Sequence, residues 1–175
     1  MGVDHIDLQS AKQNNVIITN TPDVLTEATV DIATLLLLSV TRNAYLMETM
    51  LRQGEWKGFS LTENLGVGVR GKTLGLVGMG RIGKAIARRA EAFNCEISYH
   101  SRNKKDVKYR FYSDLKELAK EVDTLCIITP GGKETEKLIN KDVLNNLGEN
   151  GVLINVARGS VSYTHLRAHE TLDNL

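Results

Sequence analysis

The chain has 175 residues, of which 42% are hydrophobic and 25% are charged, and its formal net charge is +1. This length suits one ordinary domain and is short for a two-domain enzyme. The nearly balanced charge disfavours a nucleic-acid partner, which would call for a clear basic excess.

The sequence predicts neither a membrane span nor a secretory leader. Its longest apolar run, residues 32–40, is far shorter than the roughly 20 residues that a span requires. The first residues lack a basic stretch followed by an apolar core. Cys95 and Cys126 lie in apolar stretches without the spacing of zinc or redox motifs. We therefore expect a cytoplasmic protein with two buried thiols, no metal and no membrane partner.

The first part of the chain predicts a short strand, a turn and a long helix. Residues 16–19 form a β-branched run, and residues 20–23 are typical of a turn. Thr26 is the predicted N-cap of a helical stretch that meets no proline or glycine until Gly54. Apolar residues within 28–40 fall on nearly every face, which predicts a helix buried on all sides.

A regular alternation of strands and helices follows a linker-like passage at residues 51–70. The predicted strands are 72–77, 95–99, 124–129 and 152–156, and the predicted helices are 81–93, 113–120 and 142–147. Such alternation favours an α/β fold with a doubly wound parallel sheet, the Rossmann architecture.

A glycine motif joins the first of these strands to its helix. Gly78, Gly80 and Gly83 fit the pattern G-x-G-x-x-G in the strand–turn–helix context that gives this pattern its meaning. The first glycine permits a tight turn, the second admits a pyrophosphate, and the third lets the helix pack closely on the strand. The motif predicts dinucleotide binding; the alternative is a glycine-rich turn that binds no ligand.

The end of the second strand bears on which dinucleotide is bound. An NAD-binding protein usually carries Asp or Glu there to bind the ribose 2′-hydroxyl. Here the chain has Ser101 and Arg102, followed by Lys104 and Lys105. A 2′-phosphate meets no carboxylate there and finds cations to neutralise it. NADP(H) is therefore favoured over NAD(H); the alternative is a solvated basic turn without a ligand.

Several segments together resemble the D-isomer-specific 2-hydroxyacid dehydrogenases, and among them the glyoxylate and hydroxypyruvate reductases. The resemblance runs from about Gly2 to Val161. The segments that carry it are residues 2–7, 16–22, 71–83, 128–130, Thr135, 138–140 and 153–159. It implies an oxidoreductase that transfers a hydride between NADPH, or NADH, and a small 2-oxo acid such as glyoxylate or hydroxypyruvate. It also implies a homodimer for the full-length parent.

The resemblance also implies roles for particular residues. Besides the glycines and the Ser101–Arg102 pair, the cofactor would be contacted by Arg81, Ile82, Thr129, Pro130, Thr135, Val156 and Ala157. Arg158 would be the catalytic arginine that holds the substrate carboxylate and polarises the ketone. The alternative for Arg158 is a surface arginine that follows a buried strand.

The resemblance places a catalytic Glu and His well downstream of the arginine. His165, His169 and Glu170 follow Arg158 too closely to match that pattern, and we assign them no catalytic role. A histidine suits the proton transfer that such a reduction needs.

The resemblance divides the chain into three parts. Residues 1–22 are expected to end the first half of a substrate domain, residues 23–161 to form the dinucleotide-binding domain, and residues 162–175 to be a tail unlike the family. With so little of the substrate domain, we expect this chain to bind cofactor without turnover. Two alternatives stay open: a dinucleotide-sensing module like the corepressors that share this fold, and a truncated product without a function of its own.

Overall fold

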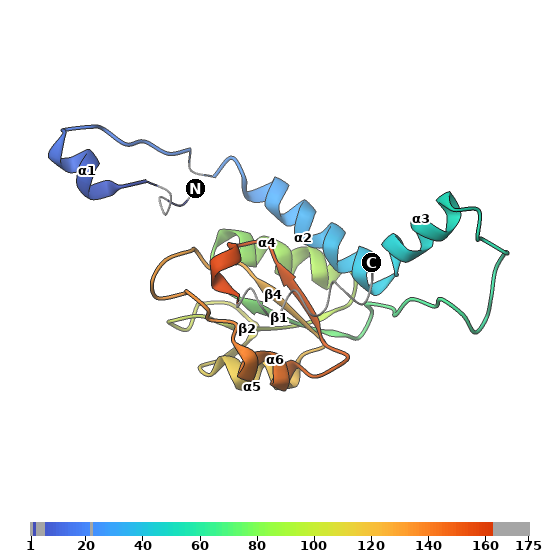
Figure 1. Cartoon of the computed structure of the whole chain (residues 1–175). Coiled ribbons are helices and arrows are strands. Elements are labelled where there is room, and N and C mark those ends of the chain that lie inside the picture. The colour runs from blue at the N-terminus through green and yellow to red at the C-terminus, as the bar shows by residue number, and fades with distance from the viewer. Residues whose placement is uncertain (1, 3–5, 22, 163–175) are drawn as a thin grey trace.

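The structure, a computed structural model, describes residues 2, 6–21 and 23–162. Among these residues, five strands form one parallel sheet in the order β3-β2-β1-β4-β5 (Figure 1). The strands are β1 (Thr73–Val77), β2 (Glu96–His100), β3 (Arg110–Tyr112), β4 (Thr124–Ile127) and β5 (Val152–Asn155). The predicted doubly wound parallel sheet is confirmed, and β3 is a strand that the sequence patterns did not predict.

Helices cover both faces of the sheet. One face packs against α2 (Thr26–Thr41) and α4 (Arg81–Ala92), and the other against α5 (Leu115–Glu121) and α6 (Lys141–Leu147) (Figure 1). Alternate residues of a strand point to opposite faces. Leu74 and Leu76 of β1 accordingly enter the core beneath α2 and α4, whereas Val77 enters the core beneath α5 and α6.

Helix α2 lies against α4 along one face only. Val30, Ala33 and Leu37 are buried there, while Ile32 and Leu35 on other faces are more than half exposed. The prediction of a helix buried on all sides is therefore wrong for the described residues, because no other element among them covers those faces. The N-cap is Leu25 rather than Thr26, and it makes no side-chain cap hydrogen bond.

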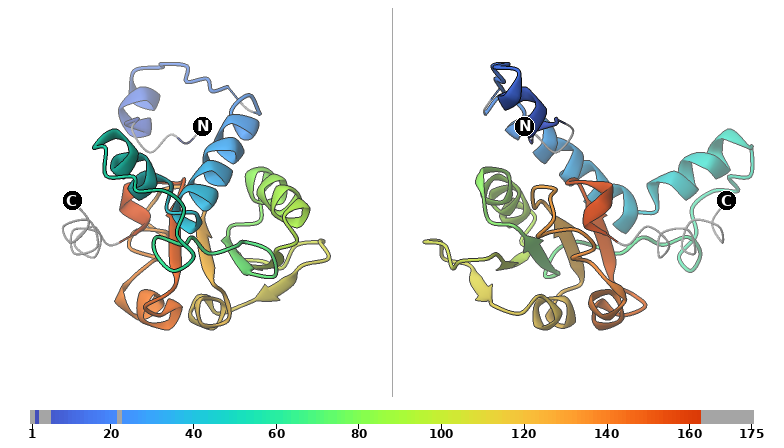
Figure 2. Two further views of the ribbon diagram at one scale, coloured as in Figure 1. Left: turned by 90° about the vertical axis from the view of Figure 1, so that its right-hand side faces the viewer. Right: turned by 60° about the vertical axis from the view of Figure 1, so that its left-hand side comes forward.

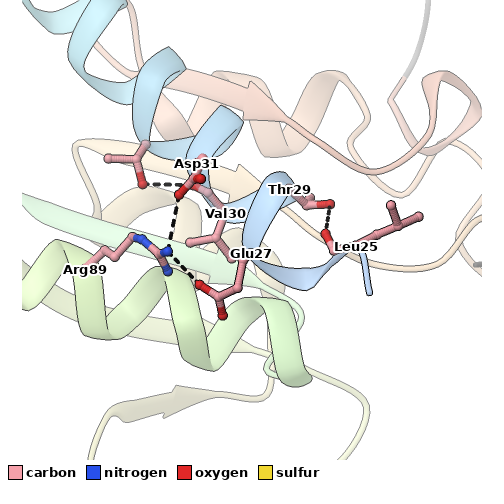
Figure 3. Close-up of polar contacts among 7 residues, drawn as sticks. Leu25, Glu27, Thr29, Val30, Asp31 and Arg89 are labelled. Carbon is pink, nitrogen blue, oxygen red and sulfur yellow. Dashed lines mark hydrogen bonds and ion pairs between the residues drawn. The ribbon is translucent and has the colours of Figure 1, made fainter. Parts of the chain in front are cut away.

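An ion-pair cluster also joins the two helices. The Arg89 guanidinium of α4 donates to Glu27 at 2.6 Å and to Asp31 at 3.2 Å, both on α2 (Figure 3). Glu27 lies in the first turn of α2, where the helix dipole also favours a negative charge. Hydrogen bonding to Arg89 lowers the pKa of Glu27 below its usual value. The cluster adds polar contacts to the apolar packing of α2 against α4.

The predicted helical stretch up to Gly54 is broken at Asn43, whose left-handed backbone (φ 52°) turns the chain. Helix α3 (Ala44–Arg52) starts there and projects from the body together with the segment that follows it (Figure 2). In the described part of the chain, no single helix is long and apolar enough to span a membrane; α2 and α3 meet that test only as a pair bent by 69°.

The segment before α2 lies outside the layers of the sheet and its helices (Figures 1 and 2). It holds one short helix, α1 (Leu8–Gln13). The strand predicted at residues 16–19 is not formed: Val16 N–H donates to Ala11 O at 2.8 Å, and the Ile17 side chain is 88% exposed. A β-branched run becomes a strand only beside a partner strand, and the described chain places none there.

The two thiols differ in their surroundings. Cys126 on β4 is fully buried, and burial raises the pKa of its thiol to about 12. Cys95 is only half-buried and donates to the carbonyl oxygen of Val69 at 3.3 Å. Burial raises the pKa of Cys95 as well. The prediction of buried thiols holds fully for Cys126 and in part for Cys95.

Candidate dinucleotide-binding site

The predicted site residues gather at one edge of the sheet. They follow the carboxyl ends of β1, β2, β4 and β5, which all lie at the same edge because the strands are parallel. The chain runs from β1 to β2 on one side and later returns to β4 on the other, so β1 and β4 flank a topological switch point. Ligands of doubly wound sheets bind at this position.

The loop after β1 requires two of its three glycines for steric reasons. Gly78 has φ 115°, which side chains rarely adopt, and it passes close to the backbone of residues 128–129. A Cβ on Gly83 would collide with the carbonyl oxygen of Gly78. The third glycine is different, because a Cβ on Gly80 would meet nothing within 4 Å. Gly80 therefore leaves open space beside the loop, of the kind that a close-approaching pyrophosphate needs.

Helix α4 begins at this loop without a side-chain cap. Its N-cap, Gly80, offers no side-chain acceptor, and its first turn contains no acidic residue. The first N–H groups of a helix have no intrahelical partner, and the helix dipole is positive at this end. The backbone N–H groups of Arg81, Ile82 and Gly83 are thus suited to bind an anion. The Arg81 side chain forms an ion pair with Asp23, on the segment before α2.

Two adjoining hollows lie along this edge and share Gly78, Gly80 and Pro130. The larger has a volume of about 720 Å³, within the usual range for ligand sites. Seven of the predicted site residues line it: Gly78, Gly80, Ser101, Arg102, Thr129, Pro130 and Thr135. The smaller, of about 240 Å³, lies over the start of α4 and includes Arg81, Ile82 and Gly83 with Asp23 and Thr26.

The loop after β2 is held from below by Tyr99. Tyr99 is fully buried, and its hydroxyl accepts from Lys105 N–H at 2.8 Å and donates to Lys105 O at 3.1 Å. Within the loop, Ser101 Oγ donates to Asn103 O at 2.7 Å. His100, the last residue of β2, places Nδ1 3.1 Å from the carbonyl oxygen of Tyr112. The loop therefore presents Ser101 and Arg102 to the larger hollow from a fixed base.

The loop after β4 forms the wall of the larger hollow opposite the loop after β2. Thr135 Oγ donates to Pro130 O at 2.6 Å, and Thr135 N–H donates to Gly132 O at 3.0 Å, which closes a compact turn. Across the hollow, Arg102 Nη1 donates to Glu134 Oε2 at 2.7 Å. The buried Thr129 hydroxyl has no hydrogen-bond partner within the described part of the chain. A buried polar atom without a partner, beside a hollow of ligand size, fits a bound group that supplies the missing partner.

The loop after β5 is organised by Asn155. Its side chain accepts from Ala157 N–H at 2.9 Å and donates to Arg158 O at 3.0 Å and to Ser162 Oγ at 3.1 Å. Arg158 is exposed, with Nη1 3.2 Å from Ala157 O. Val156, Ala157 and Arg158 line neither hollow. They follow β5, which lies next to β4, and so lie at the same edge of the sheet as the other site residues.

Several lining residues were not among the predicted site residues. Asp23, His100 and Glu134 line one hollow or the other, and Asn155 shapes the turn that carries Arg158. His100 ends the second strand and so had a positional signal. Asp23 and Glu134 had none, because their partners lie far away in the sequence. The described residues contain no group of three metal-binding side chains close enough to hold an ion.

The chain is similar to known reductases and dehydrogenases. The chain is 43% identical over 162 residues to glyoxylate/hydroxypyruvate reductase A of Arabidopsis thaliana, covering 91% of this chain and 50% of that protein. It is 40% identical over 173 residues to glyoxylate reductase of Pyrococcus horikoshii, covering 94% and 52%. The chain thus spans about half the length of the curated relatives it matches.

A solved structure extends the likeness to a nucleotide complex. The NADPH-dependent glyoxylate/hydroxypyruvate reductase of Sinorhizobium meliloti, in complex with NADP and malonate, superposes with a TM-score of 0.87 and 42% identity. The match covers 97% of this chain and 54% of that one. Residues 34–165 match the family model for the NAD binding domain of the D-isomer specific 2-hydroxyacid dehydrogenases. The chain belongs to the D-isomer specific 2-hydroxyacid dehydrogenase family, whose NAD binding domain its residues 34–165 match.

Proposed function

We propose that this chain is the nucleotide-binding part of an NADP(H)-preferring oxidoreductase that acts on a 2-oxo acid such as glyoxylate or hydroxypyruvate. The observation that carries the proposal is the pair of hollows at the carboxyl edge of the sheet. Their walls combine a glycine loop, an uncapped helix start and a basic loop after β2. The names of the relatives supply the class of substrate.

The proposed orientation of the dinucleotide follows from the chemistry of each wall. The pyrophosphate lies on the N–H groups that start α4. The adenosine ribose lies between the loops after β2 and β4, where the Thr129 hydroxyl is available to it. Its 2′-phosphate lies beside Ser101 and Arg102, and the nicotinamide end extends toward Val156 and Ala157. Thr135 shapes the turn of the β4 loop.

The preference for NADP(H) rests on charge at the end of β2. Arg102 and Lys105 line the larger hollow, and the run from Ser101 to Lys105 contains no carboxylate. Arginine forms paired, charge-assisted hydrogen bonds with phosphate. The ribose 2′-hydroxyl of NADH lacks the charge to use them. We expect NADPH to bind about tenfold more tightly than NADH, equivalent to about 1.4 kcal/mol.

Arg158 is the proposed substrate-binding and catalytic residue. The bound nicotinamide supplies the hydride. A guanidinium at Arg158 holds the carboxylate of the 2-oxo acid and stabilises the negative charge that develops on the ketone oxygen. Asn155 positions Arg158 by binding its carbonyl oxygen.

The proposed turnover also needs a proton donor. Among residues 2, 6–21 and 23–162, the one histidine is His100. His100 lines the larger hollow, where the adenosine is proposed to bind, whereas Arg158 lies outside that hollow. We therefore propose that these residues bind the cofactor but do not turn over a substrate by themselves. A corepressor-like module gains no support from the relatives, which are named as reductases.

Two further parts of the proposal concern assembly. Residues 6–21, which lie outside the layered fold, are proposed to belong with the substrate domain of the parent protein (Figure 1). The parent is proposed to be a homodimer, because α2 and α3 expose apolar side chains that the described chain leaves uncovered.

Titration with NADPH and with NADH, followed by nicotinamide fluorescence, tests this function. An assay of glyoxylate and hydroxypyruvate reduction accompanies it. The proposal predicts saturable NADPH binding, weaker NADH binding and no turnover by this chain. Failure to bind either nucleotide would contradict the proposed site. Clear turnover would show that a proton donor lies within the chain after all.

A further inference from the structure

Among the described residues, Glu134 is the one carboxylate that lines the larger hollow, and it lies where the 2′-phosphate is proposed to bind. It shares this lining with the cations Arg102, Lys105 and Lys133. Its Oε2 accepts from Arg102 Nη1 at 2.7 Å, although the two residues are 32 positions apart. The contact therefore crosses the hollow from the β4 loop to the β2 loop. The residue proposed to bind the phosphate already has an anionic partner from the opposite wall.

The position of Glu134 is set by its own loop rather than by Arg102. The neighbouring Thr135 makes two hydrogen bonds that close the turn, to Pro130 O at 2.6 Å and to Gly132 O at 3.0 Å. Gly132 in this turn has φ 149°. A backbone fixed in this way keeps residue 134 beside the hollow even when Arg102 turns away.

We propose that Glu134 is a specificity-determining residue that competes with the ribose 2′-phosphate for Arg102. This inference rests on the proposed function. To bind the phosphate, Arg102 must leave Glu134, and the phosphate must then lie near an unpaired carboxylate of the same sign. The unphosphorylated ribose of NADH meets neither cost. Its 2′-hydroxyl can instead donate to Glu134, which then plays the part of the carboxylate that is missing after β2.

The competition is moderate in size because the ion pair is open to water. The Arg102 and Glu134 side chains are 85% and 76% exposed, so solvent screens their attraction. Glu134 therefore narrows the preference for NADP(H) without reversing it. Removing its charge widens that preference.

The experiment compares Glu134→Gln with the unaltered chain, using two pairs of ligands whose members differ only in the 2′-phosphate. Adenosine 2′,5′-bisphosphate and adenosine 5′-monophosphate are titrated by calorimetry, and NADPH and NADH by fluorescence. We expect Glu134→Gln to bind the two 2′-phosphorylated ligands about three- to tenfold more tightly. Binding of the unphosphorylated ligands is unchanged or weaker. The gain decreases at high salt, since the groups are exposed.

Two controls separate this mechanism from a general change in charge. Glu136→Gln removes the same charge two residues further along, from an exposed side chain that does not line the hollow. It is expected to leave the selectivity unchanged. In an Arg102→Gln background, Glu134→Gln is expected to lose most of its effect, because the two residues act as a pair.

The possible outcomes separate a specific role of Glu134 from a general effect of charge and from failure of the proposed function. A selective gain that depends on Arg102 and is absent in Glu136→Gln supports the inference. Equal affinities in Glu134→Gln and the unaltered chain, or an equal gain in Glu136→Gln, overturn it while the proposed function stands. If the unaltered chain binds none of the four ligands, the proposed function fails and this inference fails with it.

Discussion

The buried Thr129 hydroxyl offers a test at the scale of a single residue. Its oxygen has no hydrogen-bond partner among the residues that the structure describes, which costs folding free energy. Thr129→Val keeps the shape and removes the hydroxyl. We expect the ligand-free chain to gain up to about 1 kcal/mol in free energy of unfolding. Binding of NADPH should weaken by roughly three- to tenfold, as for the loss of one hydrogen bond.

Urea unfolding and nucleotide titration measure these two effects separately. Thr135→Val serves as the comparison, because the Thr135 hydroxyl already donates to Pro130 O and its loss should destabilise the ligand-free chain. A Thr129→Val variant that is less stable and binds NADPH normally would show that the hydroxyl serves the fold and not the ligand.

Single residues also show how far the sequence could predict this site. The glycine motif was readable because its three members lie on one short turn, where spacing alone determines their steric roles. Arg102 was readable because it lies in the loop directly after a predicted strand. Glu134 was not, because its contact with Arg102 depends on how two loops meet across the sheet edge. Nothing in the local pattern around Glu134 distinguishes it from a solvated surface acid.

At the scale of elements, the docking of α2 on α4 can be tested at Val30. This side chain is fully buried in the core that also contains Leu74 and Ile86. Val30→Ala should lower the free energy of unfolding by about 2 kcal/mol, through lost burial and the cavity left behind. Ile32→Ala, on an exposed face of the same helix, should cost less than about 0.5 kcal/mol. Equal losses at both positions would mean that a second face of α2 is covered in solution.

A pH-dependent contact of Asp123 joins the beginnings of β1 and β4. Asp123 accepts from Lys72 Nζ and from Thr73 N–H, each at 2.8 Å, and so ties the beginning of β4 to that of β1. Burial opposes ionisation of Asp123, but these hydrogen bonds outweigh it and hold its pKa below the ordinary value of 3.8. A lowered pKa in the folded state means that the ionised carboxylate stabilises the fold above pH 3.8. That contribution is lost as the pH falls through the lowered pKa.

Asp123→Asn tests this contact by urea unfolding at neutral pH and below pH 3.8. At neutral pH the variant should be less stable by about 1 kcal/mol, a modest value because the pair is partly exposed. The difference should shrink as the pH falls. A difference that stays constant over this range would assign the effect to shape rather than to charge.

The elements that the sequence predicted correctly are those whose environment is determined locally. From Thr73 onward, buried strands alternate with one-sided helices, and the hydrophobic patterns follow this arrangement closely. The three-residue strand β3 is too short to produce such a pattern. The β-branched run at residues 16–19 has the composition of a strand but lacks a partner. The break at Asn43 depends on the left-handed backbone conformation of this one residue. Asparagine tolerates that conformation, but its presence in a sequence does not predict it.

At the scale of the whole molecule, the exposed apolar residues of α2, α3 and the following segment should drive association. They include Leu35, Leu36, Tyr45, Leu46, Trp56 and Phe59. Sedimentation should show a mass that rises with protein concentration. Leu35→Lys should weaken this association, whereas Leu8→Lys, on the separate helix α1, should not. A chain that stays monomeric at all concentrations would contradict the proposed use of this surface.

The central claim is that a dinucleotide lies along the carboxyl edge of the sheet, and nuclear magnetic resonance of the ¹⁵N-labelled chain tests it most directly. On addition of NADPH, the largest amide shifts should fall in residues 78–83, 101–105 and 129–135. Thr73, Asp123 and Val152, at the opposite edge of the sheet, line a separate hollow of about 130 Å³. The amide signals of these residues should shift very little. Shifts concentrated at that opposite edge, or none at saturating NADPH, would contradict the account.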